Sequence, residues 1–314
     1  MSLTQDLVPY GGWAKAIRLR RDGWELIAPL EIGPRILRLG PVDGPNILFE
    51  NQEQMGKSGA QEWMIYGGHR LWTAPENDQC YAPDNDRVSL ELLPEKGCRL
   101  TGQKNETFGW QKSLEILWHP NGLIQIEHRL MNHTAKPLPV SPWCLTVLNQ
   151  GGVASIPQPA YVPHPMDLPK GTKFAMEDYL PNRNLTLWKY TDLADARINL
   201  GRNLWTLSQK KDTKAFKIGF RHTEGWIGYQ LGDLFFAKWI SHDKEATYPD
   251  RGSNTELFTN GDILEIESLA PEKPVPPSSH SIHHEWWHIA KVKFNSSDES
   301  SIRQHLVSLP RPIP

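Results

Sequence analysis

The sequence has little cysteine, no excess of basic residues and no long apolar run, and each shortage excludes a class of protein. Its 314 residues include only three cysteines, Cys80, Cys98 and Cys144, an odd number without a C-x-x-C pair. This pattern indicates reduced, mostly packing thiols of a cytoplasmic protein rather than a disulfide framework. A net charge of −2 offers no basic surface to nucleic acid or to a membrane.

No segment is expected to carry the chain to or through a membrane. Residues 1–12 lack the basic region and apolar run of a signal peptide, and no apolar stretch has the length needed to span a bilayer. We therefore expect a cytoplasmic location, with neither a nucleic-acid nor a membrane partner.

Tryptophan and proline are abundant, with 13 and 26 residues, and strong helical patterns are few. Short strands between turn residues are expected along most of the chain, Asn46–Glu50 among them, which indicates an all-β protein. Residues Gln158 to Asn182 are rich in Pro and polar groups and are expected to form a long excursion. The one convincing helix is predicted at Asp298–Leu309, with Ser297 or Asp298 as its N-cap. No low-complexity linker or internal repeat divides the chain, so residues 1–314 are predicted to form a single domain of antiparallel strands in large packed sheets.

The stretch from Asn254 to Pro271 predicts a β-hairpin with its turn at Asn260-Gly261-Asp262, where Asn and Gly accept the positive φ that a hairpin connection needs. Alternation along the second strand places Glu265 and Glu267 on one face, and Glu256 on the first strand is a third acid nearby. Acids in such a row are either ordinary solvated residues or groups that face a sugar or act in catalysis, and the pattern leaves both open.

A second suggestive stretch runs from Gly67 to Glu76. Its paired glycines allow close backbone approach, and His69, Arg70 and Trp72 follow at once. His69 suits a hydrogen-bonded core histidine as well as a catalyst, and Trp72 suits core packing as well as stacking on a sugar.

The residues His284 to His288 spell H-E-x-x-H, the pattern of zinc proteases. Flanking aromatic and β-branched residues favour a strand here, and on a strand the two histidines would lie about 13 Å apart at ~3.3 Å per residue. That separation is too long for one ion, so we predict no metal and no cofactor.

Four short motifs carry a resemblance to a known family, and they are Gly67–Glu76, Pro142–Val147, Tyr248–Gly252 and Glu256–Asn260. With them the chain resembles a bacterial domain-of-unknown-function family of the galactose mutarotase-like superfamily, which carries the signature G-G-H-R-L-W-x-A-P-E. The match covers about Trp24 to Trp287. The resemblance implies a β-supersandwich with a shallow sugar-binding cup, together with the short C-terminal helix noted above.

The superfamily also holds the aldose 1-epimerases, to which the chain is distantly similar. Those enzymes open a sugar hemiacetal with a glutamate base and a histidine acid. The resemblance implies Glu267 as the base, His69 as the acid and Arg70 as a residue that holds sugar hydroxyls. Further sugar contacts are expected from Trp72, Glu265, Glu256, Asp250 and Lys238.

The chain also departs from the epimerase pattern. The second histidine of the epimerases has no counterpart in Ser141-Pro142-Trp143-Cys144, and the order G-G-H replaces L-H-G-G. Three readings therefore stay open. The chain is an epimerase-like enzyme acting on a sugar, a non-catalytic carbohydrate-binding protein, or a fold in which these residues form a buried ion-pair network. The sugar and the oligomeric state are not encoded.

Overall fold

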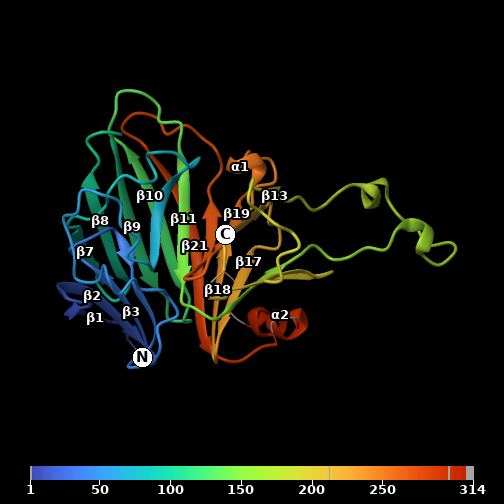
Figure 1. Cartoon of the computed structure of the whole chain (residues 1–314), viewed down its shortest axis with the longest axis horizontal. Helices are drawn as coiled ribbons and strands as arrows, with labels where there is room; N and C mark the ends of the chain where they lie inside the picture. Colours follow the sequence, from blue (N-terminus) through green and yellow to red (C-terminus); the bar gives the residue numbers. More distant parts are fainter. Residues whose placement is uncertain (1, 212, 296–297, 309–314) are drawn as a thin grey trace.

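The computed structural model describes residues 2–211, 213–295 and 298–308, and it consists mainly of three antiparallel sheets. Two of them are large and pack face to face, as Figure 1 shows. The predicted all-β class is confirmed.

The largest sheet has ten strands. In spatial order they are β14 (Ile198–Leu200), β15 (Leu204–Ser208), β12 (Val153–Pro157), β17 (Trp226–Leu231), β18 (Leu234–Ile240), β21 (His280–Lys291), β10 (Ile124–Asn132), β9 (Trp110–Trp118), β8 (Gly97–Lys104) and β7 (Ser89–Leu93). The H-E-x-x-H sequence lies within β21, so its predicted strand conformation is confirmed.

The second sheet has seven strands. They are β13 (Thr186–Leu187), β16 (Phe216–Phe220), β19 (Thr255–Thr259), β20 (Leu264–Leu269), β11 (Ser141–Leu148), β6 (His69–Ala74) and β4 (Arg35–Ile36). The predicted hairpin therefore forms, as β19 and β20.

A four-stranded sheet and a few helical turns complete the chain. The strands are β1 (Thr4–Tyr10), β2 (Trp13–Arg21), β3 (Trp24–Pro29) and β5 (Arg38–Pro41). The helical segments are η1 (Pro165–Asp167), η2 (Met176–Tyr179), α1 (Pro249–Gly252) and α2 (Glu299–Val307). Asp298 caps α2 by accepting from the Ser301 amide, as predicted, whereas Ser297 and Leu309 lie outside the described residues. No helix of the described part is long and apolar enough to cross a membrane.

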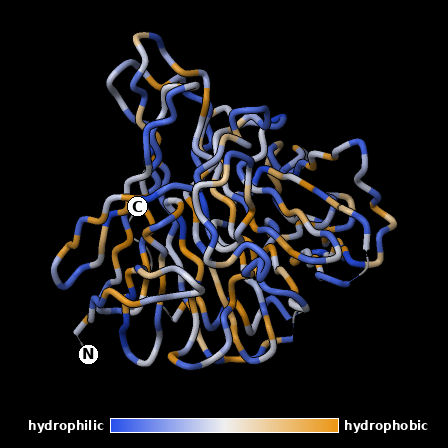
Figure 2. Tube along the Cα trace, turned by 60° about the vertical axis from the view of Figure 1, so that its left-hand side comes forward, coloured by the Kyte–Doolittle hydropathy of each residue, from blue (hydrophilic) through white to orange (hydrophobic). Residues whose placement is uncertain are grey.

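The main hydrophobic core lies between the two large sheets. Leu71, Cys144 and Ile266 of the seven-stranded sheet belong to the same cluster as Leu114 and Ile126 of the ten-stranded sheet. Apolar and polar segments alternate through the body of the molecule in Figure 2, as expected for strands that each bury one face. The opposite face of the seven-stranded sheet, called the outer face below, carries a second cluster with Trp72, Trp143 and Leu269.

Two local predictions need correction. The stretch Asn46–Glu50 was expected to be a strand, but it forms only the isolated bridges Leu48–Leu148 and Glu50–Gly67. The β19–β20 turn was expected to need a positive φ. Instead, Asn260 Oδ1 accepts from the amides of Asp262 and Ile263, at 2.8 and 3.0 Å.

The predicted long excursion after β12 is confirmed. Residues 158–185 leave the sheets as an extended loop that carries η1 and η2 away from the body (Figure 1).

Candidate functional site

Strand register brings three of the predicted site residues into one row on the outer face. Arg70 on β6 lies opposite Leu145 on β11, and Leu145 lies opposite Glu267 on β20. Glu256 on β19 is the next member of the row, directly opposite Glu267. Because directly opposed residues share a face of a sheet, these side chains from distant parts of the chain converge.

Arg70 forms a buried ion pair with Glu265, the second acid of β20. Its Nη2 lies 3.1 Å from Glu265 Oε1, and both side chains are at most 8% exposed. Burial lowers the pKa of Arg70 and raises the pKa of Glu265, and their mutual attraction opposes both shifts. Arg70 Nε and Nη1 have no hydrogen-bond partner within the described chain, so two donors remain for a ligand.

Glu256 and Glu267 share one ammonium group, that of Lys217 on β16. Lys217 Nζ lies 2.8 Å from Glu256 Oε2 and 3.2 Å from Glu267 Oε2. Attraction by the two carboxylates raises the pKa of Lys217, although burial by itself would lower it. The three groups are 4% exposed or less, so the predicted alternative of ordinary solvated acids is wrong.

Glu267 is held by a second donor as well. The indole Nε1–H of Trp143 donates to Glu267 Oε2 at 2.8 Å, while Oε1 of Glu267 has no partner among the described residues. The sequence pattern around Trp143 carries no signal for this hydrogen bond. The same holds for Lys217, which sits in an ordinary alternating strand.

Aromatic rings border the acids. Trp72 contacts Trp143, Trp63 and Tyr81 edge to face, with ring centroids 5.0–5.8 Å apart. The Arg70 guanidinium lies 4.8 Å from the centre of the Trp72 ring. At the other end, the Lys217 ammonium lies 4.8 Å from the ring of Trp188, which follows β13. Indole faces and charged hydrogen-bonding groups together are what a sugar site requires.

Asp250 borders the same site from α1. It is half-buried with a φ of 48°, and its backbone carbonyl accepts from the hydroxyls of Thr186 and Ser253. Its carboxylate is close enough to add to the pKa shift of Glu256.

His69 and Lys238 do not join this site. His69 precedes Arg70 on β6 and points to the other face of the sheet, where it is fully buried between the two large sheets. Lys238 on β18 is equally buried there and pairs with Glu285 at 2.7 Å. The expected meeting of His69 with Glu267 and Arg70 is therefore corrected, and so is the expected sugar contact of Lys238.

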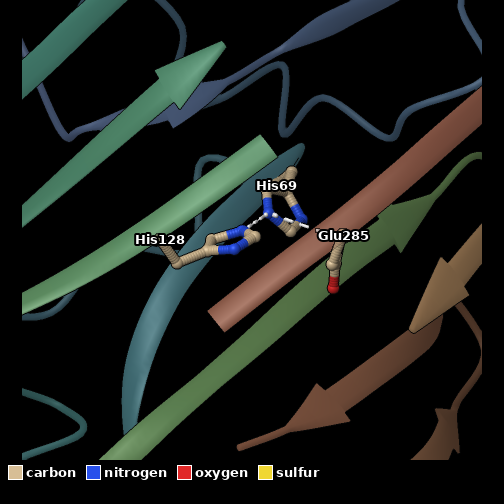
Figure 3. Close-up of side chains that lie close together, drawn as sticks. All are labelled: His69, His128 and Glu285. Carbon is tan, nitrogen blue, oxygen red and sulfur yellow. Dashed lines mark hydrogen bonds and ion pairs between the residues drawn. The ribbon is translucent and has the colours of Figure 1, made fainter. Parts of the chain in front are cut away.

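His69 instead contacts His128, as Figure 3 shows. His128 Nδ1 lies 3.0 Å from the carbonyl oxygen of His283, which can only accept, so Nδ1 carries the proton. Burial lowers the pKa of His128 to about 4, which leaves its Nε2 as an acceptor at neutral pH. His69 Nε2–H therefore donates to it at 2.6 Å, and His69 Nδ1 accepts from the Thr146 hydroxyl at 2.9 Å.

Glu285 completes this inter-sheet network. It accepts from Lys238 and Ser268 on Oε1 and from the Trp287 indole on Oε2, at 2.6–2.7 Å. Ligand atoms of His69, His128 and Glu285 lie within 4.8 Å of one another, a spacing that a metal site also shows. Here every ring nitrogen of the two histidines is already paired, so the donor set fits a closed hydrogen-bond network better than a metal centre. Sequence reasoning missed this network, because its members lie on strands far apart in the sequence, and local patterns do not show which strands pack together.

No family model matches the sequence, and no curated protein matches it. Among solved structures, the chain is similar to a galactose mutarotase-like protein from Lactobacillus casei over 88% of this chain and 100% of that one, with a TM-score of 0.56 and 9% identity. It is also similar to a proposed mutarotase from Salmonella typhimurium over 92% and 94% of the two chains, with a TM-score of 0.54 and 12% identity.

A TPR-domain containing protein from Parabacteroides distasonis matches 95% of the chain with a TM-score of 0.60 and 10% identity. The chain spans 49% of that protein, about half its length. At such identities the likeness shows the fold alone. The predicted galactose mutarotase-like fold is thereby confirmed.

Proposed function

We propose that this protein binds a sugar on the outer face of the seven-stranded sheet and catalyses proton transfer at its hemiacetal, as a mutarotase does. The proposal is supported by a mutarotase-like fold and by Arg70, Glu256, Glu265 and Glu267 meeting on one face beside several indoles.

One observation carries the proposal: buried polar atoms in this site lack hydrogen-bond partners. Within the described chain they are Nε and Nη1 of Arg70, Oε1 of Glu267 and both carboxyl oxygens of Glu256. An unpaired buried donor or acceptor costs about 1–3 kcal/mol, so a ligand that pairs with these atoms relieves that cost. Sugar hydroxyls both donate and accept, and they match donors on Arg70 and an acceptor on Glu267.

Glu267 is the base in this proposal. Its Oε2 is fixed by Lys217 and Trp143, which holds the carboxylate in one orientation and leaves Oε1 to take the proton of the C1 hydroxyl. Arg70 orients the sugar, and Trp72 supplies an apolar face for the ring.

A non-catalytic carbohydrate-binding protein is the second candidate. It requires the hydrogen-bonding groups and indoles of the outer face, but no group that moves a proton. The same hydrogen bonds would then hold a sugar without proton transfer.

Anomerisation of freshly dissolved aldoses, followed by NMR, separates the two. The enzyme proposal expects saturable acceleration that Glu267→Gln abolishes while the circular dichroism spectrum and the melting temperature stay near wild type. Saturable sugar binding without acceleration supports the binding protein. Acceleration that survives in Glu267→Gln removes this residue from the role of base.

The cytoplasmic location and the single domain remain predictions. Cys80, Cys98 and Cys144 are buried free thiols, which suits a reducing compartment.

A further inference from the structure

Two carboxyl groups on neighbouring strands share a single buried cation. Glu256 and Glu267 are directly opposed across β19 and β20, and they are 0% and 1% exposed. Lys217 Nζ contacts one oxygen of each, at 2.8 and 3.2 Å. The other nearby cation, Arg70, is already paired with Glu265.

The charge count of this group requires a proton. Two buried carboxylates facing one ammonium leave one negative charge without a partner. Two buried carboxyl groups that contact the same ammonium do not both ionise readily, because their negative charges repel each other. The proton therefore stays on one of the two carboxyl groups.

The surroundings decide which carboxyl group keeps it. Glu267 receives the Trp143 indole N–H in addition to Lys217, and both donors stabilise its anion. Glu256 has only the ion pair with Lys217 among the described residues, and neither of its oxygens has a hydrogen-bond partner there. Burial raises the pKa of Glu256 well above its usual range; Lys217 opposes the shift, and the charges of Glu267 and Asp250 add to it.

We propose that Glu256 is the proton donor that works with Glu267 in the reaction. This inference rests on the proposed function. It gives Glu256 the role of acid, which was expected of His69, because the His69 side chain points to the opposite face of the sheet. In the ring-opening step, Glu267 takes the proton of the C1 hydroxyl, the bond from C1 to the ring oxygen breaks, and the ring oxygen takes the proton of Glu256. The products are an open-chain aldehyde, a neutral Glu267 and an ionised Glu256. Closure on the other face of C1 returns both protons.

The position of Lys217 keeps the free-energy cost of this proton exchange low in a buried site. During ring opening the negative charge moves from Glu267 to Glu256. The ammonium contacts both carboxyl groups, so the ion pair is kept before and after the transfer. The rings of Trp143 and Trp188 hold the ammonium in place, with their centres 4.5 and 4.8 Å away.

The first test detects the proton bound by the Glu256–Glu267 pair and does not depend on any enzymatic reaction. The infrared spectrum of the wild-type protein at pH 7 should contain a protonated-carboxyl band. Glu256→Gln and Glu267→Gln should each remove it, because either variant leaves one carboxylate facing the ammonium of Lys217. Absence of that band in the wild type, or its survival in Glu256→Gln, overturns the inference whether or not the protein is active.

The second test is anomerisation of glucose and galactose. Glu256→Gln should lower kcat about 10²–10⁴-fold with little change in KM, the usual range for a general acid. It should also remove the loss of rate at alkaline pH, and Glu256→Asp should restore part of the rate. The matched control is Glu115→Gln, an acid of the ten-stranded sheet that pairs with Arg99 and should leave the rate unchanged.

The outcomes separate the two claims. A wild-type band with no anomerisation overturns the proposed function. Anomerisation that Glu256→Gln reduces less than tenfold in a folded protein overturns the role of Glu256 and leaves the function standing.

Discussion

His69 and Arg70 are consecutive residues of β6 that serve opposite faces of the seven-stranded sheet. The imidazole of His69 lies 2.6 Å from His128 between the sheets, and the guanidinium of Arg70 lies 3.1 Å from Glu265 on the outer face. The alternation of a β-strand forces this division. One motif therefore supplies a residue to the core network and a residue to the candidate sugar site.

Replacing Arg70 tests the ion pair of the outer face. Arg70→Met should destabilise the protein by about 3–5 kcal/mol, because it leaves the buried carboxylate of Glu265 unpaired. The double variant Arg70→Met/Glu265→Leu should recover much of this loss in urea unfolding. Equal unfolding free energies for the single and double variants would contradict the pairing. Both variants should bind sugar more weakly.

Replacing His69 separates the two faces. His69→Ala removes the acceptor of the Thr146 hydroxyl proton and the donor to His128 Nε2. It should cost a few kcal/mol of stability, at about 1–3 kcal/mol for each buried group left unpaired. At a temperature where the variant is folded, its sugar affinity should match wild type in an NMR titration. A selective loss of the anomerisation rate with unchanged stability would mean that His69 takes part in the reaction.

Lys238 tests the closed network between the sheets. Its ammonium donates to Glu285, to Thr146 and to the Ile266 carbonyl at 2.7–3.1 Å. Lys238→Met should destabilise the fold by about 3–5 kcal/mol, and adding Glu285→Gln should relieve part of the cost. Urea unfolding of the single and double variants measures this. An added zinc salt should not stabilise the wild type, whereas a zinc-dependent rise in melting temperature would mean that His69 and His128 hold a metal.

Acid should destabilise the protein between pH 6.5 and about 4. Burial lowers the pKa values of His128 and His222 to about 4 and of His283 to about 3, so each binds its proton in the unfolded chain near pH 6.5 but not in the folded one. The unfolded state then holds more protons in this window, and stability falls as the pH is lowered. Each group contributes about 1.4 kcal/mol per pH unit.

Urea unfolding across pH 4–8 measures that dependence. Substituting His222 by Asn should reduce the slope between pH 6.5 and 4, and substituting the exposed His280 by Gln should leave it unchanged. An unchanged slope in the His222 variant would show that His222 titrates normally.

The indole N–H of Trp143 can be removed by a change to phenylalanine, which also makes the buried ring smaller. Trp143→Phe keeps a ring next to Trp72 but loses the donor to Glu267 at 2.8 Å. A hydrogen bond to a charged group contributes about 1.5–3 kcal/mol, so we expect a loss of stability in that range and a lower anomerisation rate. Trp118→Phe, in the core between the sheets, is the control; it should lower stability and leave the rate unchanged.

The sequence by itself determined the local pattern of this protein. Abundant turn residues and alternating strands predicted an all-β chain, and the alternation from Leu264 to Leu269 placed Glu265 and Glu267 on one face. The same alternation, applied to β6, places His69 and Arg70 on opposite faces, whereas the resemblance to epimerases implied that both act in one sugar site.

Only the tertiary structure decided which side chains meet. Strand order in the seven-stranded sheet places β16, β11 and β6 beside the β19–β20 hairpin, although they are far from it in the sequence. This order sets the partners of Glu267 as Lys217, Trp143 and Glu256. Local periodicity carries no information on strand order. Two strands can pair across a connection of any length, so the pattern within one strand does not identify its partner. Burial follows the same rule: whether an acid faces water or a shared lysine depends on what the rest of the chain packs over it.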